Sequence, residues 1–251
     1  MKLIFCQCKY AGVLPDDVSQ ALLGRLKEGG RDFVCVDDLC AMAADKDTRL
    51  KDWARDENVI VLGCYARAVR WLFFLAGAEL KPSARIFNLR TVSAEDIINS
   101  LAGEKLPRGS ARIIAADKDP QAWFPVIDYQ RCKNCRQCLS FCLFGVYELD
   151  DDGRVEVKRP LNCKYGCPAC ARVCPEGAII FAKYAESPIN GDEVDEETFR
   201  QGRKDVKGLI AAEIEKRMKL QGRDSAEAGR GGALLEFLKS RGGGAGGLQD
   251  E

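Results

Sequence analysis

Eight cysteines in two closely spaced runs constrain this chain more than any other feature. The first run has the spacing C-x2-C-x2-C-x3-C, and the second has C-x3-C-x2-C-x3-C followed by Pro175. The eight residues are Cys132, Cys135, Cys138, Cys142, Cys163, Cys167, Cys170 and Cys174. Two residues between cysteines form a tight loop that aims three thiolates at one small centre, and its backbone N–H groups offset the negative charge of the sulfurs. The spacing therefore predicts loops built around bound inorganic centres.

The centre that this spacing favours is a [4Fe–4S] cube. We expect the fourth cysteine of each run to start a short helix and to reach the cluster of the other run. One cluster is assigned to Cys132, Cys135, Cys138 and Cys174, and the other to Cys163, Cys167, Cys170 and Cys142. The alternatives are zinc and disulfides. Zinc needs two knuckles of two ligands each and gains nothing from such a run, and disulfides need an oxidising compartment.

On these motifs the stretch from Val126 to Tyr184 resembles the bacterial-type two-cluster ferredoxins. The resemblance implies an α+β domain with two [4Fe–4S] clusters. Two features depart from the pattern: Leu143 follows the first run where a proline is usual, and the first two cysteines of the second run are one residue further apart, so that loop should bulge. Between the runs, Val146 to Val157 alternates around Asp-Asp-Gly, which predicts a hairpin that extends the ferredoxin sheet.

Ahead of these motifs, apolar strands alternate with amphipathic helices. The expected strands are Leu3–Cys6, Asp32–Val36, Val59–Gly63 and Ala84–Leu89, and Arg112–Ala115 is a candidate for one more. The expected helices are Asp16–Lys27, Thr48–Asp56, Ala66–Ala76 and Ala94–Leu101. This alternation predicts an α/β domain with a small, parallel, Rossmann-like sheet covered on both faces.

Four of the remaining five cysteines follow expected strands. They are Cys6, Cys8, Cys40 and Cys64, with Cys40 placed in the loop after the second strand. Open α/β sheets bind ligands outside the carboxyl ends of their strands, so these four thiols should converge there. Cys35 lies inside a strand and is expected to be a core residue. A dinucleotide is disfavoured because no strand-to-helix turn carries G-x-G-x-x-G.

The segments FCQC, DDLC and VIVLGCYARAVRWLFFLAGAEL, with IFNLR after them, resemble the N-terminal domain of the flavin-binding subunit of heterodisulfide reductase. That family has C-x-C, a cysteine and C-S-P-R after its first three strands. Here Tyr65-Ala66-Arg67 replaces Ser-Pro-Arg, and the flavin-binding domain that normally follows is missing. The resemblance implies a third [4Fe–4S] cluster on Cys6, Cys8, Cys40 and Cys64. Buried core thiols or redox-active thiols are the alternatives.

Composition narrows the function classes. Lys and Arg total 38 against 38 Asp and Glu, so neither nucleic acid nor an acidic membrane surface is the expected partner. There is no histidine, which excludes haem on a proximal imidazole and Rieske centres. The N-terminus is too short and polar for a signal peptide, and no apolar run is long enough to span a membrane. We therefore expect a reducing cytoplasm.

The predicted organisation is an α/β domain over residues 1–105, a linker over 106–125, a ferredoxin domain over 126–190 and a helical, disordered tail over 191–251. In the linker, Trp123–Pro125 either seals a cluster or packs between domains. In the tail, the amphipathic segment Asp195–Met218 either folds back on the body of the protein or docks to another subunit. The apolar island Ala233–Leu238 is either a short docking helix or part of a flexible end. Five basic residues surround the cysteines: Arg131, Lys133, Arg136, Lys164 and Arg172. Three roles are open for them: to raise the cluster potentials, to dock an acidic partner, or only to form a solvated surface.

These features together predict a non-catalytic electron-transfer subunit that relays single low-potential electrons within a multi-subunit oxidoreductase complex of an anaerobic type. By resemblance, its partners are hydrogenase, heterodisulfide reductase-like or formate dehydrogenase-like proteins. One alternative is an enzyme with its own substrate or thiol site at the N-terminal cysteines. Proton transfer there would fall to a poor set: Lys9, Tyr10, Tyr65 and Arg67. Another alternative is a redox sensor or assembly scaffold.

Overall fold

The computed structural model describes residues 1–104, 106–115 and 122–202. The chain divides into two units, Met1–Glu193 and Val194–Glu251. In the second unit residues 196–202 are helical, which agrees with the start of the helix predicted over Asp195–Met218. The rest of that helix and the apolar island Ala233–Leu238 lie outside the described residues.

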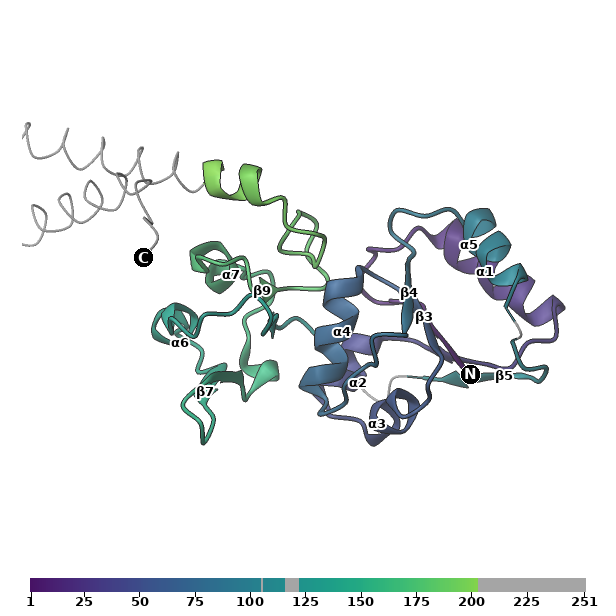
Figure 1. Cartoon of the computed structure of the whole chain (residues 1–251), viewed down its shortest axis with the longest axis horizontal. Helices are drawn as coiled ribbons and strands as arrows, with labels where there is room; N and C mark the ends of the chain where they lie inside the picture. Colours follow the sequence, from purple (N-terminus) through teal and green to yellow (C-terminus); the bar gives the residue numbers. More distant parts are fainter. Residues whose placement is uncertain (105, 116–121, 203–251) are drawn as a thin grey trace, which may run out of the picture. The chain divides into compact units, whose positions relative to one another are not determined.

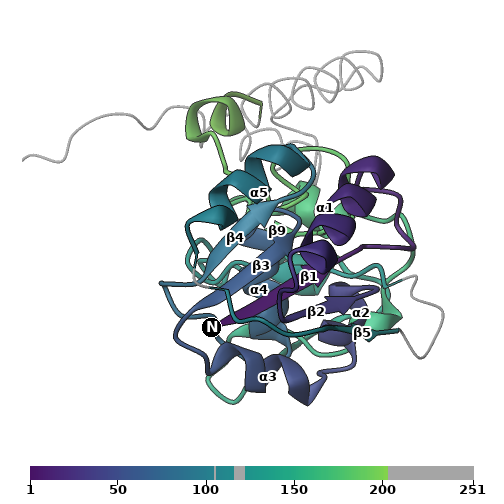
Figure 2. The ribbon, with the colours of Figure 1, turned by 90° about the vertical axis from the view of Figure 1, so that its right-hand side faces the viewer.

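A five-stranded parallel sheet forms the centre of the N-terminal part of the first unit (Figures 1 and 2). Its strands, in the order β4-β3-β1-β2-β5, are β1 (Lys2–Cys6), β2 (Phe33–Val36), β3 (Val59–Gly63), β4 (Arg85–Asn88) and β5 (Ala111–Ile114). Ile4 of β1 pairs with Val34 of β2 on one side and Val61 of β3 on the other. The apolar runs of the three central strands are buried on both faces, as a covered parallel sheet requires.

Helices cover both faces of this sheet. Helices α1 (Asp16–Glu28) and α5 (Ala94–Ala102) lie on one face, and α2 (Leu39–Ala44), α3 (Thr48–Ala54) and α4 (Ala66–Leu75) lie on the other (Figure 1). Leu22 of α1 and Phe73 of α4 are both fully buried. The predicted parallel α/β sheet with covered faces is confirmed.

Helix α2 is the one element of this domain that the sequence pattern did not predict. Its six residues are too few to show a helical period, although Asp38 supplies a start signal. The Asp38 carboxylate accepts hydrogen bonds from the backbone N–H groups of Cys40 and Ala41 at 2.8 and 3.1 Å. Cys40 therefore lies in the first turn of a helix, and its predicted place in a loop is wrong.

The cysteine runs lie among short elements. Strand β6 (Val126–Ile127) pairs with β9 (Ile179–Ile180), and β7 (Tyr147–Leu149) pairs with β8 (Val155–Val157), both antiparallel. Helices α6 (Gln137–Phe141) and α7 (Ala169–Val173) and the 3-10 helix η1 (Pro160–Asn162) complete this region. The predicted hairpin is confirmed, but it forms a two-stranded sheet of its own and does not extend the β6–β9 pair.

Candidate metal centres

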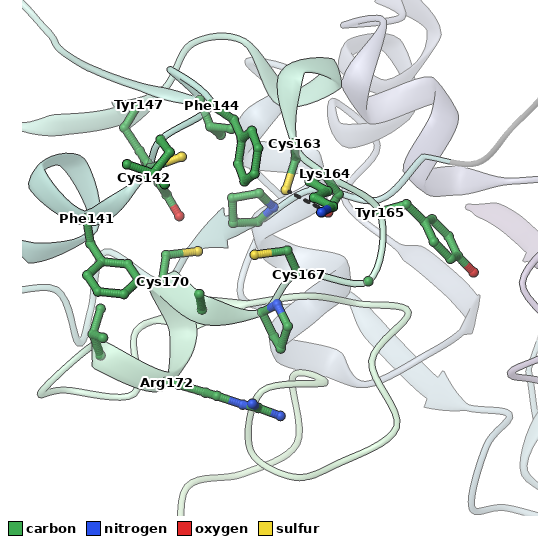
Figure 3. A pocket seen from close by; sticks show the side chains of 17 residues that line it. Phe141, Cys142, Phe144, Tyr147, Cys163, Lys164, Tyr165, Cys167, Cys170 and Arg172 are labelled. Carbon is green, nitrogen blue, oxygen red and sulfur yellow. Dashed lines mark hydrogen bonds between the residues drawn. The ribbon is translucent and has the colours of Figure 1, made fainter.

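A cavity of about 620 Å³ lies beside α6 and α7 and is lined by four cysteines (Figure 3). They are Cys142, Cys163, Cys167 and Cys170. Three belong to the second run, and the fourth is the last cysteine of the first run. The structure therefore brings together the four residues that the spacing assigned to one cluster, including the member that crosses over from the other run. None of the thirteen cysteines, all of which lie in the described residues, forms a disulfide.

The last cysteine of each run ends a short helix, so the prediction that it starts one is wrong. Cys138 is the second residue of α6, and Cys142 caps its C-terminus with an N–H that donates to the Cys138 carbonyl at 3.1 Å. Cys170 and Cys174 hold the corresponding positions in α7. For the first run the reason is local: Arg136, at φ 61°, ends the loop in the left-handed region, so α6 begins at the next residue and the x3 spacing spans one turn.

Two further cysteines of the first run, Cys132 and Cys138, lie near Cys174 of the second. Burial raises the pKa of the Cys132 thiol, and the negative charge of Cys174 and Cys135 raises that pKa further. Burial also raises the pKa of Cys138 to about 12, and Cys174 again adds to the effect. These charge interactions link Cys132 and Cys138 to Cys174, and Cys138 also to Cys170, so the assignment of Cys132, Cys135, Cys138 and Cys174 to one cluster stays a prediction.

Backbone N–H groups point at several sulfurs, as the loop argument requires. The N–H of Asn134 lies 3.4 Å from Cys132 Sγ, and the N–H of Ala178 lies 3.3 Å from Cys174 Sγ. Such donors offset the negative charge of a thiolate and help to set the potential of a bound cluster.

No three Cys, Asp or Glu side chains in the described ranges converge closely enough to hold a single metal ion. An iron–sulfur cluster makes a different demand, because its thiolates bind different irons of a larger core.

The four N-terminal cysteines also gather at one place. Cys6 ends β1, Cys8 follows it at φ 47°, Cys40 lies in α2, and Cys64 follows β3. Burial raises the pKa of each of these four thiols, to about 12 for Cys8 and about 11 for Cys64. The charges of neighbouring cysteines raise the pKa of Cys6, Cys8 and Cys40 further. The chain passes from β1 to β2 on one side and returns to β3 on the other, so this is the switch point where such sheets bind ligands. Cys35, 1% exposed, lies in the core as predicted.

A buried ion pair borders the N-terminal cysteines. Lys183 Nζ, from the segment after β9, contacts the Asp38 carboxylate at 2.5 Å, and the two side chains are 8% and 0% exposed. Asp38 raises the pKa of Cys40, and Lys183 opposes that shift. Sequence reasoning missed this pair because its members are far apart in the chain. The capping position of Asp38 was the only local signal.

A second charged junction involves Arg67, at the start of α4. Its guanidinium donates to Asp128 Oδ2 at 3.0 Å and to the carbonyls of Asp192 and Gly177 at 2.5 and 3.0 Å. The Arg67 and Asp128 side chains are 11% and 4% exposed. Arg67 therefore links the N-terminal sheet region to the cysteine-run region, and this engagement removes it from the candidates for proton transfer.

Trp123 connects the two cysteine regions. Its ring stacks on Phe181 at 5.2 Å between centroids, and its Nε1–H donates to the Cys167 carbonyl at 3.5 Å. Trp123 and Phe181 also line a small void of about 10 Å³ together with Cys40. Its aromatic contacts agree with both predicted readings of this segment, the packing and the seal, because they fill the space between an N-terminal cysteine and a cavity cysteine.

No protein-family model matches the chain. Three curated relatives each align with about a quarter of this chain. An uncharacterized ferredoxin of Methanocaldococcus jannaschii is 52% identical over 61 residues, which is 24% of this chain and 41% of the relative. The pyruvate synthase subunit PorD of the same organism is 34% identical over 55 residues, 22% of this chain and 62% of the relative. Ferredoxin-3 of Nostoc sp. is 30% identical over 80 residues, 25% of this chain and 76% of the relative.

The cysteine runs and the short elements around them define a domain of the iron–sulfur ferredoxin class. The chain belongs to the ferredoxin family through a domain that occupies part of its length. The match covers less than two thirds of the first two relatives. In the part of the chain that the structure describes, no helix is long and apolar enough to cross a membrane.

Proposed function

We propose that this chain is an electron-transfer subunit with two [4Fe–4S] clusters on the ferredoxin cysteines and a third on Cys6, Cys8, Cys40 and Cys64. The observation that carries the proposal is the cavity lined by three cysteines of one run and Cys142 of the other. A disulfide-bonded or purely structural cysteine set has no reason to cross over between runs, whereas the two-cluster arrangement does.

The residues of this cavity fit such a cluster. The hydroxyl of Tyr147 is buried and has no hydrogen-bond partner among the described residues. It points toward Cys170, and burial raises the pKa of that thiol to about 11 (Figure 3). A donor aimed at a sulfur inside a cysteine-lined cavity is suited to a ligand thiolate. When bound, each cluster would supply one-electron redox chemistry.

The chain's own residues would connect the carriers. The Trp123–Phe181 stack contacts the Cys167 carbonyl on one side and lines a small void with Cys40 on the other, so it would keep water out of the space between the N-terminal and ferredoxin sites. The buried Lys183 cation next to Cys40 would favour the electron-rich state of a centre there. Electrons would pass between the N-terminal site and the ferredoxin pair in either direction.

We further propose that the chain works inside a multi-subunit oxidoreductase complex in the cytoplasm. Its relative PorD is named as belonging to pyruvate synthase, which supports this setting. By resemblance, the partner proteins are hydrogenase, heterodisulfide reductase-like or formate dehydrogenase-like. The domain limits at 105, 125 and 190 and a docking role for residues 191–251 belong to the same proposal.

The test is a redox titration of the anaerobically purified full chain, followed by low-temperature EPR. The wild-type chain should accept about three electrons, one per cube. Cys142→Ser and Cys64→Ser should each lose one electron and about four irons. The matched control is Cys35→Ala, which removes a buried thiol outside all three sets and should keep every centre. A wild-type chain that accepts no electrons, or a Cys142→Ser variant that accepts as many as the wild type, would refute the assignment.

A further inference from the structure

The two departures from the regular ferredoxin spacing both place an apolar side chain at the mouth of the cysteine-lined cavity. Leu143, in the position after Cys142 where a proline is usual, is 91% exposed. Tyr165, in the loop of the second run that carries the extra residue, is 65% exposed. Both residues line the cavity, and Figure 3 shows Tyr165 at its edge.

Two further apolar side chains complete what we call the apolar rim. Phe141 is 52% exposed and Phe144 is 39% exposed, and both line the same cavity as Leu143 and Tyr165. Single exposed apolar residues are common on protein surfaces, but apolar residues gathered around one opening mark an interaction site. The exposed side chains of the rim do not stabilise the fold, so we expect the rim to bind another molecule that covers them.

The charged side chains that line the cavity all carry the same sign. Lys164 and Arg172 line the cavity, and the described residues that line it include no Asp or Glu. The chain as a whole is balanced at 38 basic against 38 acidic residues, so this local excess is not a reflection of composition. Basic side chains around an apolar centre complement a surface with acidic side chains around an apolar centre.

We propose that the apolar rim, with Lys164 and Arg172, is the docking surface for a second redox protein whose contact face is acidic. This inference rests on the proposed electron-transfer function and names the kind of partner that the cavity side of the ferredoxin region serves. The charges would steer the encounter, and burial of Leu143 would hold the pair together. Docking here places the partner's cofactor next to the cavity cysteines.

The test uses the full chain, reduced and freed of excess reductant, and an oxidised acidic flavodoxin as the probe in a stopped-flow instrument. One electron leaves the chain, and the flavin gains that electron and one proton from water to form the neutral semiquinone. The second-order rate constant for the wild type should fall as salt is added. Lys164→Glu should lower it about tenfold through lost steering. Leu143→Ser should lower it about tenfold through lost apolar burial.

Matched controls make the same changes away from the rim. Leu149→Ser alters a side chain that is 41% exposed on β7, and Lys51→Glu reverses an exposed charge on α3. Both controls should react with flavodoxin at the wild-type rate. Every variant should reduce oxidised methyl viologen at the wild-type rate, because a small acceptor needs no docking surface.

The outcomes separate this proposal from the proposed function. If the wild type reduces viologen but Leu143→Ser and Lys164→Glu react with flavodoxin as the wild type does, the docking surface is refuted and electron transfer stands. If the wild type reduces neither acceptor, the proposed function fails first. Carbodiimide cross-linking should join Lys164 to the probe. A cross-link from Lys164 to acidic residues within 203–251 of the same chain, or salt-sensitive dimers in sedimentation, would assign the rim to another occupant and overturn the proposal.

Discussion

The buried Arg67–Asp128 pair gives the sharpest stability prediction. Arg67→Met removes the cation, three hydrogen bonds and the partner of a carboxylate that is only 4% exposed. Breaking a buried pair from one side costs about 3–5 kcal/mol, mainly because the remaining charge is left uncompensated. For a chain of this size each kcal/mol lowers the melting temperature by about 2–4 °C, so the loss should be on the order of 10 °C.

The assays are anaerobic urea unfolding for the free-energy cost and thermal unfolding for the melting temperature, both followed by far-UV circular dichroism. The matched control is Arg70→Met, which makes the same substitution one turn further along α4. Arg70 donates to the carbonyls of Lys81 and Ala84 and leaves no carboxylate behind, so its loss should cost about 1–2 kcal/mol. The Arg67→Met/Asp128→Asn double variant should be more stable than the sum of the single losses predicts, with a coupling energy of about 2 kcal/mol. Additive losses, or an Arg67→Met cost no greater than that of Arg70→Met, would refute the reasoning.

Three other perturbations have defined outcomes. Tyr147→Phe removes a buried hydroxyl that has no hydrogen-bond partner among the described residues, so the free energy of unfolding should change little while protein-film voltammetry shows a lower cluster potential; an unchanged potential would contradict the proposed role of this donor toward a bound cluster. Gly191→Ala, at φ 97°, would bring its Cβ to 2.6 Å from Ala68 Cβ and should cost about 2 kcal/mol or more in urea unfolding, and a neutral effect would count against this packing. Arg49 holds the pKa of Asp47 below its usual value, so Asp47 contributes stability above its unfolded pKa and loses it as pH falls through the folded one. Asp47→Asn should therefore cost up to about 1 kcal/mol at pH 7 and progressively less as the pH falls below about 4; a cost that does not change with pH would contradict the assignment.

Much of the fold was readable from the sequence because its signals are local. Strand β3 has the predicted bounds, Val59–Gly63, since a continuous apolar run between polar residues marks a buried parallel strand. Helix α1 begins at Asp16, after Pro15, as predicted. The short helix α2 was missed because six residues cannot display a helical period.

The candidate site was predictable to the extent that cysteine spacing carries geometry. The spacing placed Cys142 with the second run, and the cavity contains it there. The sequence did not show whether Cys142 starts or ends its helix, because the left-handed conformation of Arg136 decides where α6 begins. The contacts of Lys183 with Asp38 and of Arg67 with Asp128 join residues far apart in the chain, and no local pattern announces them.

The most direct test of the central claim is the iron and acid-labile sulfide content of the full chain purified without oxygen. Three cubes predict about twelve irons and twelve sulfides per chain, and about eight of each would leave the ferredoxin pair and remove the N-terminal cluster. A colourless chain with no labile sulfide, holding zinc or disulfides on these cysteines, would contradict the account.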